Sequence, residues 1–376
     1  MQIRAAVLHE RGLPRPYAES RPLRIETLEL DPPGEGELLV RIRAAGLCHS
    51  DLSVINGDRP RPVPMALGHE AAAEVVSTGP GVADLVPGDH VVLVFVPSCG
   101  HCAYCAVGRP ALCEPGNAAN VAGTLLCGER RLALEGRPIH HHLGISCFAD
   151  HAVVSRRSCV KVDPAVPFEH VALFGCAVLT GVGSVVNTAR VEPGSSVAVV
   201  GLGGVGLNAL LAARVAGAAR VVALDVLASK RSLAAELGAT DAFDAADGCV
   251  VERVRAVTAG GVECAIDFTG SEQGLELAYA ITRRGGTTVT GGLAHPERHV
   301  SLQQAGLVVE ERTLKGSYVG SCIPARDVPR FLELFAQGRL PVDRLLSRRI
   351  ERLEDINAAF DALADGTVVR QVWVTG

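Results

Sequence analysis

Three features that mark other classes of protein are missing from this sequence. It has no long run of charges of one sign, and its net charge is −5, with 36 basic and 41 acidic residues. Because a phosphate backbone is held by a concentrated basic surface, we expect no binding to nucleic acid. No stretch of about 18 uncharged apolar residues occurs, so we expect no membrane-spanning helix. The first residues lack the basic segment, apolar core and small-residue cleavage site of an export signal, which favours a cytoplasmic protein.

The chain is long and apolar enough to form more than one folded domain. It has 376 residues, of which 48% are hydrophobic and 20% charged, and at roughly 150 residues per domain this length predicts two domains. Residues 1–178 hold short β-like runs, such as 38–42 and 90–96, separated by Gly, Pro and Asp. Residues 179–317 alternate strand-like and helix-like segments, which predicts a parallel sheet with helices on both faces. Residues 318–376 are mixed, and we expect them to rejoin the first domain.

Four cysteines fall within fifteen residues as C-x2-C-x2-C-x7-C. They are Cys99, Cys102, Cys105 and Cys113. This spacing lets one loop wrap four thiolates around a tetrahedral Zn²⁺, and four thiolates leave no open position, so the pattern predicts a structural zinc in a lobe at about residues 97–115. A nucleic-acid-binding zinc module is the alternative, but the acidic net charge and the compact spacing argue against it.

A glycine-rich turn marks the start of the alternating region. The apolar run 197–200 leads into G-x-G-x-x-G and then into an apolar helix, the context that gives this motif its meaning. The predicted cofactor-binding residues of the turn are Gly201, Gly203, Gly204, Val205 and Gly206. Glycine permits the tight turn, the close approach of the pyrophosphate and the packing of helix on strand. Asp225 follows 24 residues after Gly201, where a carboxylate can bind both ribose hydroxyls and repel a 2′-phosphate, so NAD is favoured over NADP.

A second, dispersed set of metal-ligand residue types completes the pattern. Cys48 lies in the segment 46–51, His69 in 68–70 and Cys176 in 175–176. Each residue alone is weak evidence for a metal site, but together with the four-cysteine loop the three form a specific pattern. With these motifs the sequence resembles the zinc-dependent medium-chain alcohol dehydrogenases, in their longer-chain branch, over nearly the whole chain. The resemblance implies an α/β protein in which a β-rich GroES-like catalytic domain joins a doubly wound parallel-sheet (Rossmann) dinucleotide-binding domain.

The resemblance implies roles for the residues of the dispersed set and its neighbours. Cys48, His69 and Cys176 would hold a catalytic zinc with water or substrate oxygen as fourth ligand, which makes two Zn²⁺ per chain with the structural ion. Asp51 would accept a hydrogen bond from His69, and Glu70 would lie behind the metal. Either carboxylate could instead be an ordinary surface charge.

The route of the alcohol proton is only partly defined by the resemblance. Ser50 would take this proton, because a hydroxyl can both accept and donate; its alternative role is a helix N-cap. Ser53 occupies the position at which many relatives have a histidine as terminal base, so the final proton acceptor stays open.

Cofactor and substrate contacts are carried over in the same way. The implied cofactor neighbours are Thr180 under the nicotinamide, Lys230 beside the ribose, and His49 and Arg370 near the pyrophosphate. The charged residues could equally be plain surface charges, and Thr180 a helix-start hydroxyl. Phe95 and His142 would line the substrate pocket, with the loop 114–143 at its mouth.

These features predict an oxidoreductase that transfers a hydride between NAD and a zinc-bound primary alcohol or aldehyde, with aromatic alcohols among the candidates. The main alternative is a thiol-dependent formaldehyde dehydrogenase, which needs a basic residue for the thiol's carboxylate; Arg59, Arg61 and His142 are candidates. A non-catalytic zinc-containing binding protein is the distant alternative. The resemblance also implies a homodimer joined through the nucleotide-binding domains.

Overall fold

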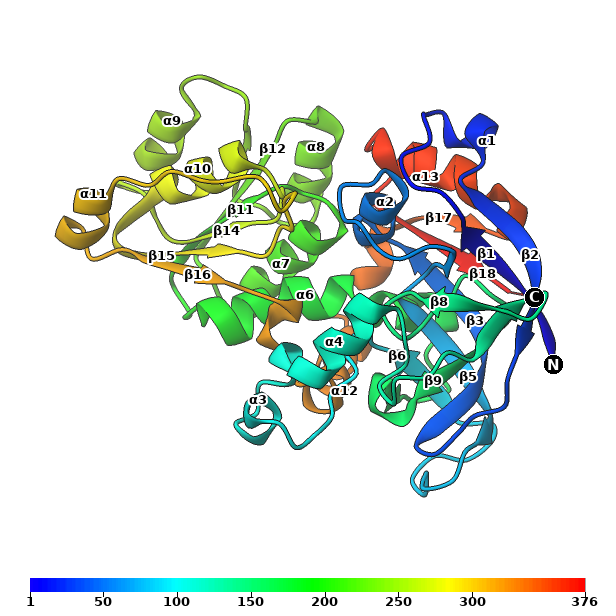
Figure 1. Cartoon of the computed structure of the whole chain (residues 1–376). Coiled ribbons are helices and arrows are strands. Elements are labelled where there is room, and N and C mark those ends of the chain that lie inside the picture. Colours follow the sequence, from blue (N-terminus) through cyan, green and yellow to red (C-terminus); the bar gives the residue numbers. More distant parts are fainter. Residues whose placement is uncertain (376) are drawn as a thin grey trace. The chain divides into compact units, whose positions relative to one another are not determined.

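The computed structural model describes residues 1–375, which form two compact units (Figure 1). The first unit joins Met1–Cys176, Ile323–Pro329 and the segment from Val342 onward, and the second joins Ala177–Cys322 and Arg330–Pro341. Within residues 1–375 no single helix has both the length and the apolar composition to cross a membrane, although one bent pair, Phe168–Gly175 with Ala177–Ala189, passes on length and composition alone.

One sheet of the first unit closes into a small barrel. Its strands, in order around the barrel, are β1 (Gln2–Leu8), β2 (Leu23–Leu30), β7 (Leu132–Leu134), β8 (Arg137–His141) and β4 (Met65–Ala66). Alternate residues of β1, such as Ile3 and Ala5, point into the barrel, while Arg4 between them is exposed, as the two-residue period of a strand requires. This barrel packs its core around Leu28, Leu125 and similar side chains.

A seven-stranded sheet forms the other half of the first unit. Its strands in order are β10 (Cys159–Lys161), β6 (His90–Leu93), β5 (Ala71–Thr78), β3 (Glu37–Leu47), β18 (Arg370–Val374) and β17 (Leu346–Ile350), with β9 (His151–Ser155) also paired to β3. Strand β18 runs antiparallel to β3, with Gln371 opposite Leu47. The last part of the chain therefore lies in the same sheet as the first part.

Short helices connect the strands of the first unit. They are α1 (Tyr17–Ser20), α2 (His49–Ile55), α3 (Ala103–Ala106), α4 (Glu114–Ala122), α5 (Phe168–Ala172) and α13 (Ile356–Ala364). The longer α12 (Pro324–Ala336) belongs to the first unit up to Pro329 and to the second beyond it. The run 90–96, expected to be one strand, is a strand only to Leu93, because from Val94 the chain leaves β5 and donates to Ser158 O at 2.7 Å.

The second unit is a six-stranded sheet in which every neighbouring pair is parallel. The order is β13 (Asp241–Asp244), β12 (Arg220–Asp225), β11 (Ser196–Val200), β14 (Val262–Asp267), β15 (Thr282–Thr290) and β16 (Thr313–Gly316). Numbered along the chain within this unit, the order is 3-2-1-4-5-6, which is the order of dinucleotide-binding sheets. The first strand, β11, lies in the middle of the sheet, where the order of strands reverses.

Helices cover this parallel sheet on both faces (Figure 1). The helices of this unit are α6 (Ala177–Gly183), which packs against α7, then α7 (Gly204–Val215), α8 (Ala228–Glu236), α9 (Val250–Val257) and α10 (Glu272–Ile281), which pack on the strands, and α11 (Gln304–Val309), which precedes β16. The central strands are buried along almost their whole length, Val197–Val200 and Val221–Asp225 among them, which explains why they are continuous apolar runs in the sequence. The predicted fold class, a β-rich domain joined to a doubly wound parallel sheet, is confirmed.

Candidate functional site

The dispersed residues Cys48, His69 and Cys176 come together in the first unit, and Glu70 joins them. The ligand atoms of these four side chains all lie within 4.8 Å of one another, and all four residues are buried. Cys48 is the residue between β3 and α2, in an extended conformation. His69 and Glu70 lie between β4 and β5, and Cys176 follows a short helical turn that ends at Gly175.

The glycines that precede two of these residues allow the backbone to approach its neighbours closely. Gly68 has φ +95°, and a Cβ added there would lie 2.5 Å from the backbone nitrogen of Phe148. A Cβ at Gly175 would overlap the carbonyl oxygen of Leu93. Any other residue at either position would push the following ligand residue out of place, which gives the Gly-His and Gly-Cys pairs of the sequence a steric reason.

The imidazole of His69 is held by a carboxylate on one side and faces the thiols on the other. Its Nδ1 lies 3.0 Å from Oδ1 of Asp51, and both side chains are fully buried. Its Nε2 is buried and has no hydrogen-bond partner among residues 1–375. A buried, unpartnered imidazole nitrogen beside two cysteine sulfurs is the donor set of a catalytic zinc site, and the carboxylate behind the histidine is the usual support for such a ligand. The residues therefore fit a zinc ion.

Charges and hydrogen bonds at this cluster favour the thiolate of Cys48, whereas the hydrogen bond to Cys48 and burial raise the pKa of Cys176. The pKa of Cys48 lies well below the usual thiol value, because Cys176 donates to its sulfur and because His69 and Arg370 add positive charge. Burial alone would raise the pKa of Asp51, but the hydrogen bond from His69 and the nearby rings of His69 and His142 outweigh burial and lower it. A thiolate is the form of cysteine that ligates a metal, so Cys48 is prepared for a cation.

Glu70 turns toward Arg370 of β18, with which it forms a buried ion pair. Burial raises the pKa of Glu70 to about 7, and the Arg370 charge opposes that rise. Oε2 of Glu70 and Nε of Arg370 are buried without a hydrogen-bond partner among the described residues. Arg370 was expected at the cofactor pyrophosphate; its contact within the first unit is with the glutamate that follows a proposed metal ligand.

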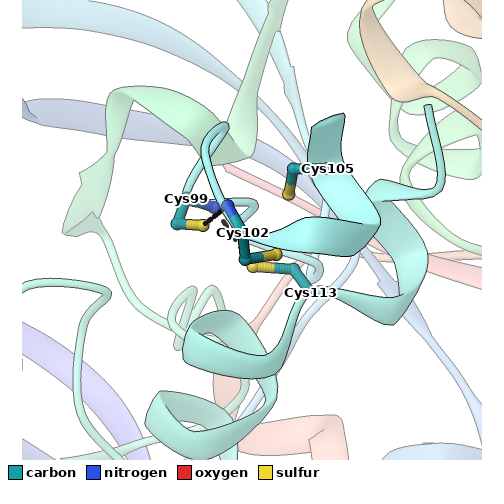
Figure 2. A group of neighbouring side chains, drawn as sticks. All are labelled: Cys99, Cys102, Cys105 and Cys113. Atoms are coloured by element: carbon teal, nitrogen blue, oxygen red, sulfur yellow. Dashed lines mark hydrogen bonds between the residues drawn. The ribbon is translucent and has the colours of Figure 1, made fainter. Parts of the chain in front are cut away.

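The four cysteines of the predicted lobe are also brought together (Figure 2). All their sulfurs lie within 4.8 Å of one another. Backbone N–H groups of Cys102 and Cys99 donate to the sulfurs of Cys99 and Cys113 at 3.3 and 3.2 Å, and Cys113 also accepts from Gly116 N at 3.4 Å. Donors aimed at sulfur stabilise thiolates, and four thiolates form a closed tetrahedral set, so these residues fit a structural zinc.

Helix α2 follows Cys48 directly in the chain and carries Ser50 and Ser53. Ser50 is half-buried in the first turn of α2, and His49 beside it is exposed. The hydroxyl of Ser53 donates to the carbonyl of His49 at 2.8 Å. Ser53, at the position where many relatives have a histidine, is therefore hydrogen-bonded within its own helix.

Phe95 and His142, predicted to line the substrate pocket, pack against the ring of His69. The ring of Phe95 meets it edge-on at 5.2 Å and that of His142 at 5.5 Å between centroids. Nδ1 of His142 also lies 3.1 Å from Oδ1 of Asp51. This second contact of the carboxylate was not predicted, because nothing in the local sequence around residue 142 indicates it.

The glycine turn of the second unit links β11 to α7. Gly201 has φ +87°, and a Cβ at Gly206 would overlap the carbonyl oxygen of Gly201. Helix α7 begins at Gly204, so its first amides border the turn, as anion binding requires. Asp225 ends β12 and accepts hydrogen bonds from the backbone of Leu202 at 2.8 Å and Leu227 at 2.9 Å. The carboxylate thus ties the turn to the end of the next strand.

Other predicted cofactor residues lie around this strand end or on α6. Lys230 is half-buried on α8, and Thr180 is buried on α6. Arg231, which the sequence analysis missed, donates to the carbonyl of Asp225 at 2.8 Å and pairs with Asp244 at 3.2 Å. The sequence signal for Arg231 was its position next to Lys230, in the helix that follows Asp225.

Comparison with known proteins gives matches over the whole chain. The family models "Alcohol dehydrogenase GroES-like domain" and "Zinc-binding dehydrogenase" match residues 34–164 and 204–337. An NDMA-dependent alcohol dehydrogenase of Amycolatopsis methanolica is 40% identical over 99% of this chain and 98% of its own. An S-(hydroxymethyl)glutathione dehydrogenase of Synechocystis sp. is 35% identical over 99% of each chain. The solved structure of benzyl alcohol dehydrogenase from Acinetobacter calcoaceticus has a TM-score of 0.93 at 31% identity, covering 100% of both chains.

Proposed function

The chain belongs to the zinc-binding alcohol dehydrogenase family, and from this premise we propose that it oxidises primary alcohols at the cluster of Cys48, His69 and Cys176, with NAD as hydride acceptor. The observation that carries the proposal is the convergence of two buried thiols and one buried, unpartnered imidazole nitrogen from three distant parts of the chain. A non-catalytic binding protein has no need of this donor set.

Within this proposal the protein's own residues prepare the site for proton removal and for a cation. A zinc ion held by Cys48, His69 and Cys176 supplies Lewis-acid polarisation of an alcohol or aldehyde oxygen. Asp51 keeps the proton of His69 on Nδ1, so that the lone pair of Nε2 faces the thiols. Ser50 is the proposed acceptor of the alcohol proton, because its half-buried hydroxyl lies two residues after Cys48.

The second unit is proposed to hold the dinucleotide. The turn at Gly201, Gly203, Gly204, Val205 and Gly206 and the start of α7 suit a pyrophosphate. Asp225 is proposed to bind the ribose hydroxyls, supported by its place at the end of β12. Thr180, Lys230, His49 and Arg370 are proposed as further cofactor contacts. The Amycolatopsis relative is named for its dependence on NDMA, so the identity of the final electron acceptor has to be tested alongside NAD.

Aromatic primary alcohols are the proposed substrates. Phe95 supplies an aromatic ring beside His69, and the structurally similar Acinetobacter enzyme is a benzyl alcohol dehydrogenase. The second candidate function is oxidation of an S-hydroxymethyl thiol, which the Synechocystis relative favours by its name. Arg59 and Arg61, both half-buried, are the candidate partners for the thiol's carboxylate.

A single set of assays tests the function. Benzyl alcohol, ethanol and octanol are offered with NAD and with NDMA, and formaldehyde is offered with NAD with and without glutathione. We expect benzyl alcohol to give the highest kcat/KM. Dependence of formaldehyde oxidation on glutathione, with no turnover of benzyl alcohol, would instead select the second candidate.

Variants of two cysteines test the proposed site. Cys48→Ser should lower zinc content from two ions to one per chain and reduce kcat/KM by at least about 100-fold, because the Lewis-acid contribution is lost. Cys249→Ser is the matched control, because Cys249 is exposed and belongs to neither cysteine cluster. Unchanged zinc content and activity in Cys48→Ser would exclude the proposed site.

We also propose a homodimer joined through the second units. Strand β16 is the edge of the parallel sheet and is exposed along its length. Leu314 of this strand is an exposed apolar residue, and so are Leu293, Val308 and Val309, which precede it in the chain. An exposed apolar sheet edge favours pairing with another chain. Leu314→Glu should shift the mass measured by analytical ultracentrifugation from dimer to monomer, and a wild-type monomer would refute the proposal.

A further inference from the structure

Two histidines share one oxygen of Asp51. Oδ1 lies 3.0 Å from Nδ1 of His69 and 3.1 Å from Nδ1 of His142. All three side chains are buried, with exposed fractions of 0% for Asp51 and His69 and 1% for His142. The other oxygen, Oδ2, accepts from the backbone nitrogen of Cys48 at 3.3 Å. Both oxygens of this carboxylate therefore contact groups of the cluster, namely Cys48 and His69, and one of them also contacts His142.

A tight turn fixes the position of His142. Strand β8 ends at His141, and the backbone nitrogen of His142 then donates to the hydroxyl of Ser146 at 3.0 Å. The carbonyl of His142 accepts from Ile145 at 3.0 Å. Leu143 and Ser146 both have positive φ, 53° and 54°, a conformation that costs energy for residues other than glycine. The turn is thus held by its surroundings, and it presents the imidazole to Asp51.

The two contacts with Oδ1 are not equivalent. The contact of His69 has hydrogen-bond geometry, whereas Nδ1 of His142 has no aligned partner although it lies almost as close. A carboxylate oxygen offers only lone pairs, so an imidazole nitrogen that faces it carries its hydrogen. The N–H dipole of His142 therefore attracts negative charge of Asp51 that would otherwise act on His69 alone.

A carboxylate behind a metal-binding histidine raises the donor strength of that histidine. We propose that His142 is a positioning residue that takes up part of the charge of Asp51, weakens the donation of His69, and so sets how tightly the cluster of Cys48, His69 and Cys176 holds its metal. The inference rests on the proposed function, since it requires that this cluster binds zinc. It assigns His142 an action through Asp51 in addition to any contact with substrate.

Two substitutions distinguish the effect of the His142 N–H group from the effect of its ring. His142→Phe keeps a planar ring beside His69 but offers no donor to Asp51. His142→Asn keeps a side-chain amide at about the place of Nδ1, so it can restore the donor. The measurement is the rate at which the metal-replete protein loses zinc to an excess of chelator. Cys48→Ser, which retains only the four-cysteine site, identifies the phase that belongs to the structural zinc.

In His142→Phe, the Cys48-dependent zinc should leave more slowly, by on the order of 3- to 10-fold, a smaller change than full loss of an outer carboxylate produces. His142→Asn should release zinc at close to the wild-type rate. In the cobalt-substituted proteins, the visible absorption bands of the Cys48-dependent ion should shift in the Phe variant and return in the Asn variant. The release rate of the structural zinc and the thermal midpoint show whether each variant is folded. His142→Leu also lacks the donor, so its Cys48-dependent zinc should leave as slowly as that of His142→Phe.

Equal zinc-release rates in wild type, His142→Phe and His142→Leu would overturn the inference. A His142→Asn variant that releases zinc as slowly as His142→Phe would also overturn it. Faster loss in the Phe variant would also overturn it, because it would mean that His142 supports the metal. A wild-type protein without any Cys48-dependent zinc would refute the proposed function itself, so the two failures are distinguishable.

Discussion

Arg370 donates a hydrogen bond to the carboxylate of Glu70, 300 positions earlier in the chain, and both side chains are buried. Glu70 directly follows His69, whose Nε2 faces the two thiols. The ion pair thus joins strand β18 to the loop that carries a proposed metal ligand. The position of that loop depends on a charge supplied from the far end of the chain.

Removing one member of this pair should be costly. Arg370→Met leaves a buried carboxylate without its counter-charge, and we expect the free energy of unfolding to fall by about 3–5 kcal/mol. Combining it with Glu70→Gln should recover most of the loss, since no unpaired charge then remains. Urea denaturation of the zinc-replete proteins measures both. Arg348→Met, at an exposed position on β17, is the control, and an equal loss in that variant would contradict the prediction.

The four-cysteine lobe should depend on its metal. Cys102→Ser removes one of four thiolates, so we expect one zinc per chain to be lost and the thermal midpoint to fall, because metal binding contributes directly to folding of such loops. Elemental analysis and calorimetry test this, with Cys249→Ser as the exposed control. Retention of two zinc ions in Cys102→Ser would refute the assignment.

Asp225 should affect both cofactor choice and stability. Asp225→Gly removes the proposed ribose ligand and the repulsion of a 2′-phosphate, so the ratio of kcat/KM for NAD over NADP should fall by roughly 10- to 100-fold, matching a charged hydrogen bond of about 1.5–3 kcal/mol. It also leaves the N–H groups of Leu202 and Leu227 without their acceptor, which should lower the free energy of unfolding. Steady-state kinetics and urea denaturation measure the two effects. Glu236→Gln, at an exposed position of α8, is the control; an unchanged cofactor ratio in Asp225→Gly counts against the role.

His141 should make the protein less stable in mild acid. Burial lowers the pKa of His141 to about 3 from its usual 6.5, with the charges of Arg130 and Arg131 adding to the effect. The unfolded chain therefore binds a proton that the folded chain does not, and stability falls as pH falls through 6.5 toward 3. Between pH 7 and 5.5 this histidine should account for about 1 kcal/mol.

His141→Gln tests the effect, because its amide oxygen can replace Nε2 as acceptor for the backbone of Arg131. The free energy of unfolding of this variant should decline less than that of wild type over the same pH range. His299→Gln, at an exposed histidine, should follow wild type. Parallel pH profiles for wild type and His141→Gln would show that His141 does not contribute.

The sequence alone predicted those parts of the site whose residues lie close together in the chain. The four-cysteine lobe and the glycine turn are each contained in a short segment, so spacing alone predicted that their members would meet. Cys48, His69 and Cys176 lie far apart in the chain, and only resemblance to a family grouped them before the structure placed their ligand atoms within 4.8 Å. Their role as ligands, like those of Ser50 and Lys230, stays a prediction.

Contacts set by tertiary packing were beyond the reach of sequence patterns. The approach of His142 to Asp51 depends on the turn at Leu143 and Ser146, where residues other than glycine adopt positive φ against their usual preference. The pairing of Glu70 with Arg370 depends on β18 lying beside β3. In both cases the partners are far apart in sequence, and only the folded first unit brings them together.

The neighbouring strands β3 and β18 are separated in the chain by the whole of the second unit. During synthesis, residues 177–322 leave the ribosome before Arg370, the ion-pair partner of Glu70, has been made. Because domains fold as units in the order in which they are made, the six consecutive strands of the second unit can assemble at that stage. The loop of His69 and Glu70 is then the last part of the first unit to gain its partner, so a nascent chain paused before β18 would have a complete parallel sheet but a Glu70 without its ion pair.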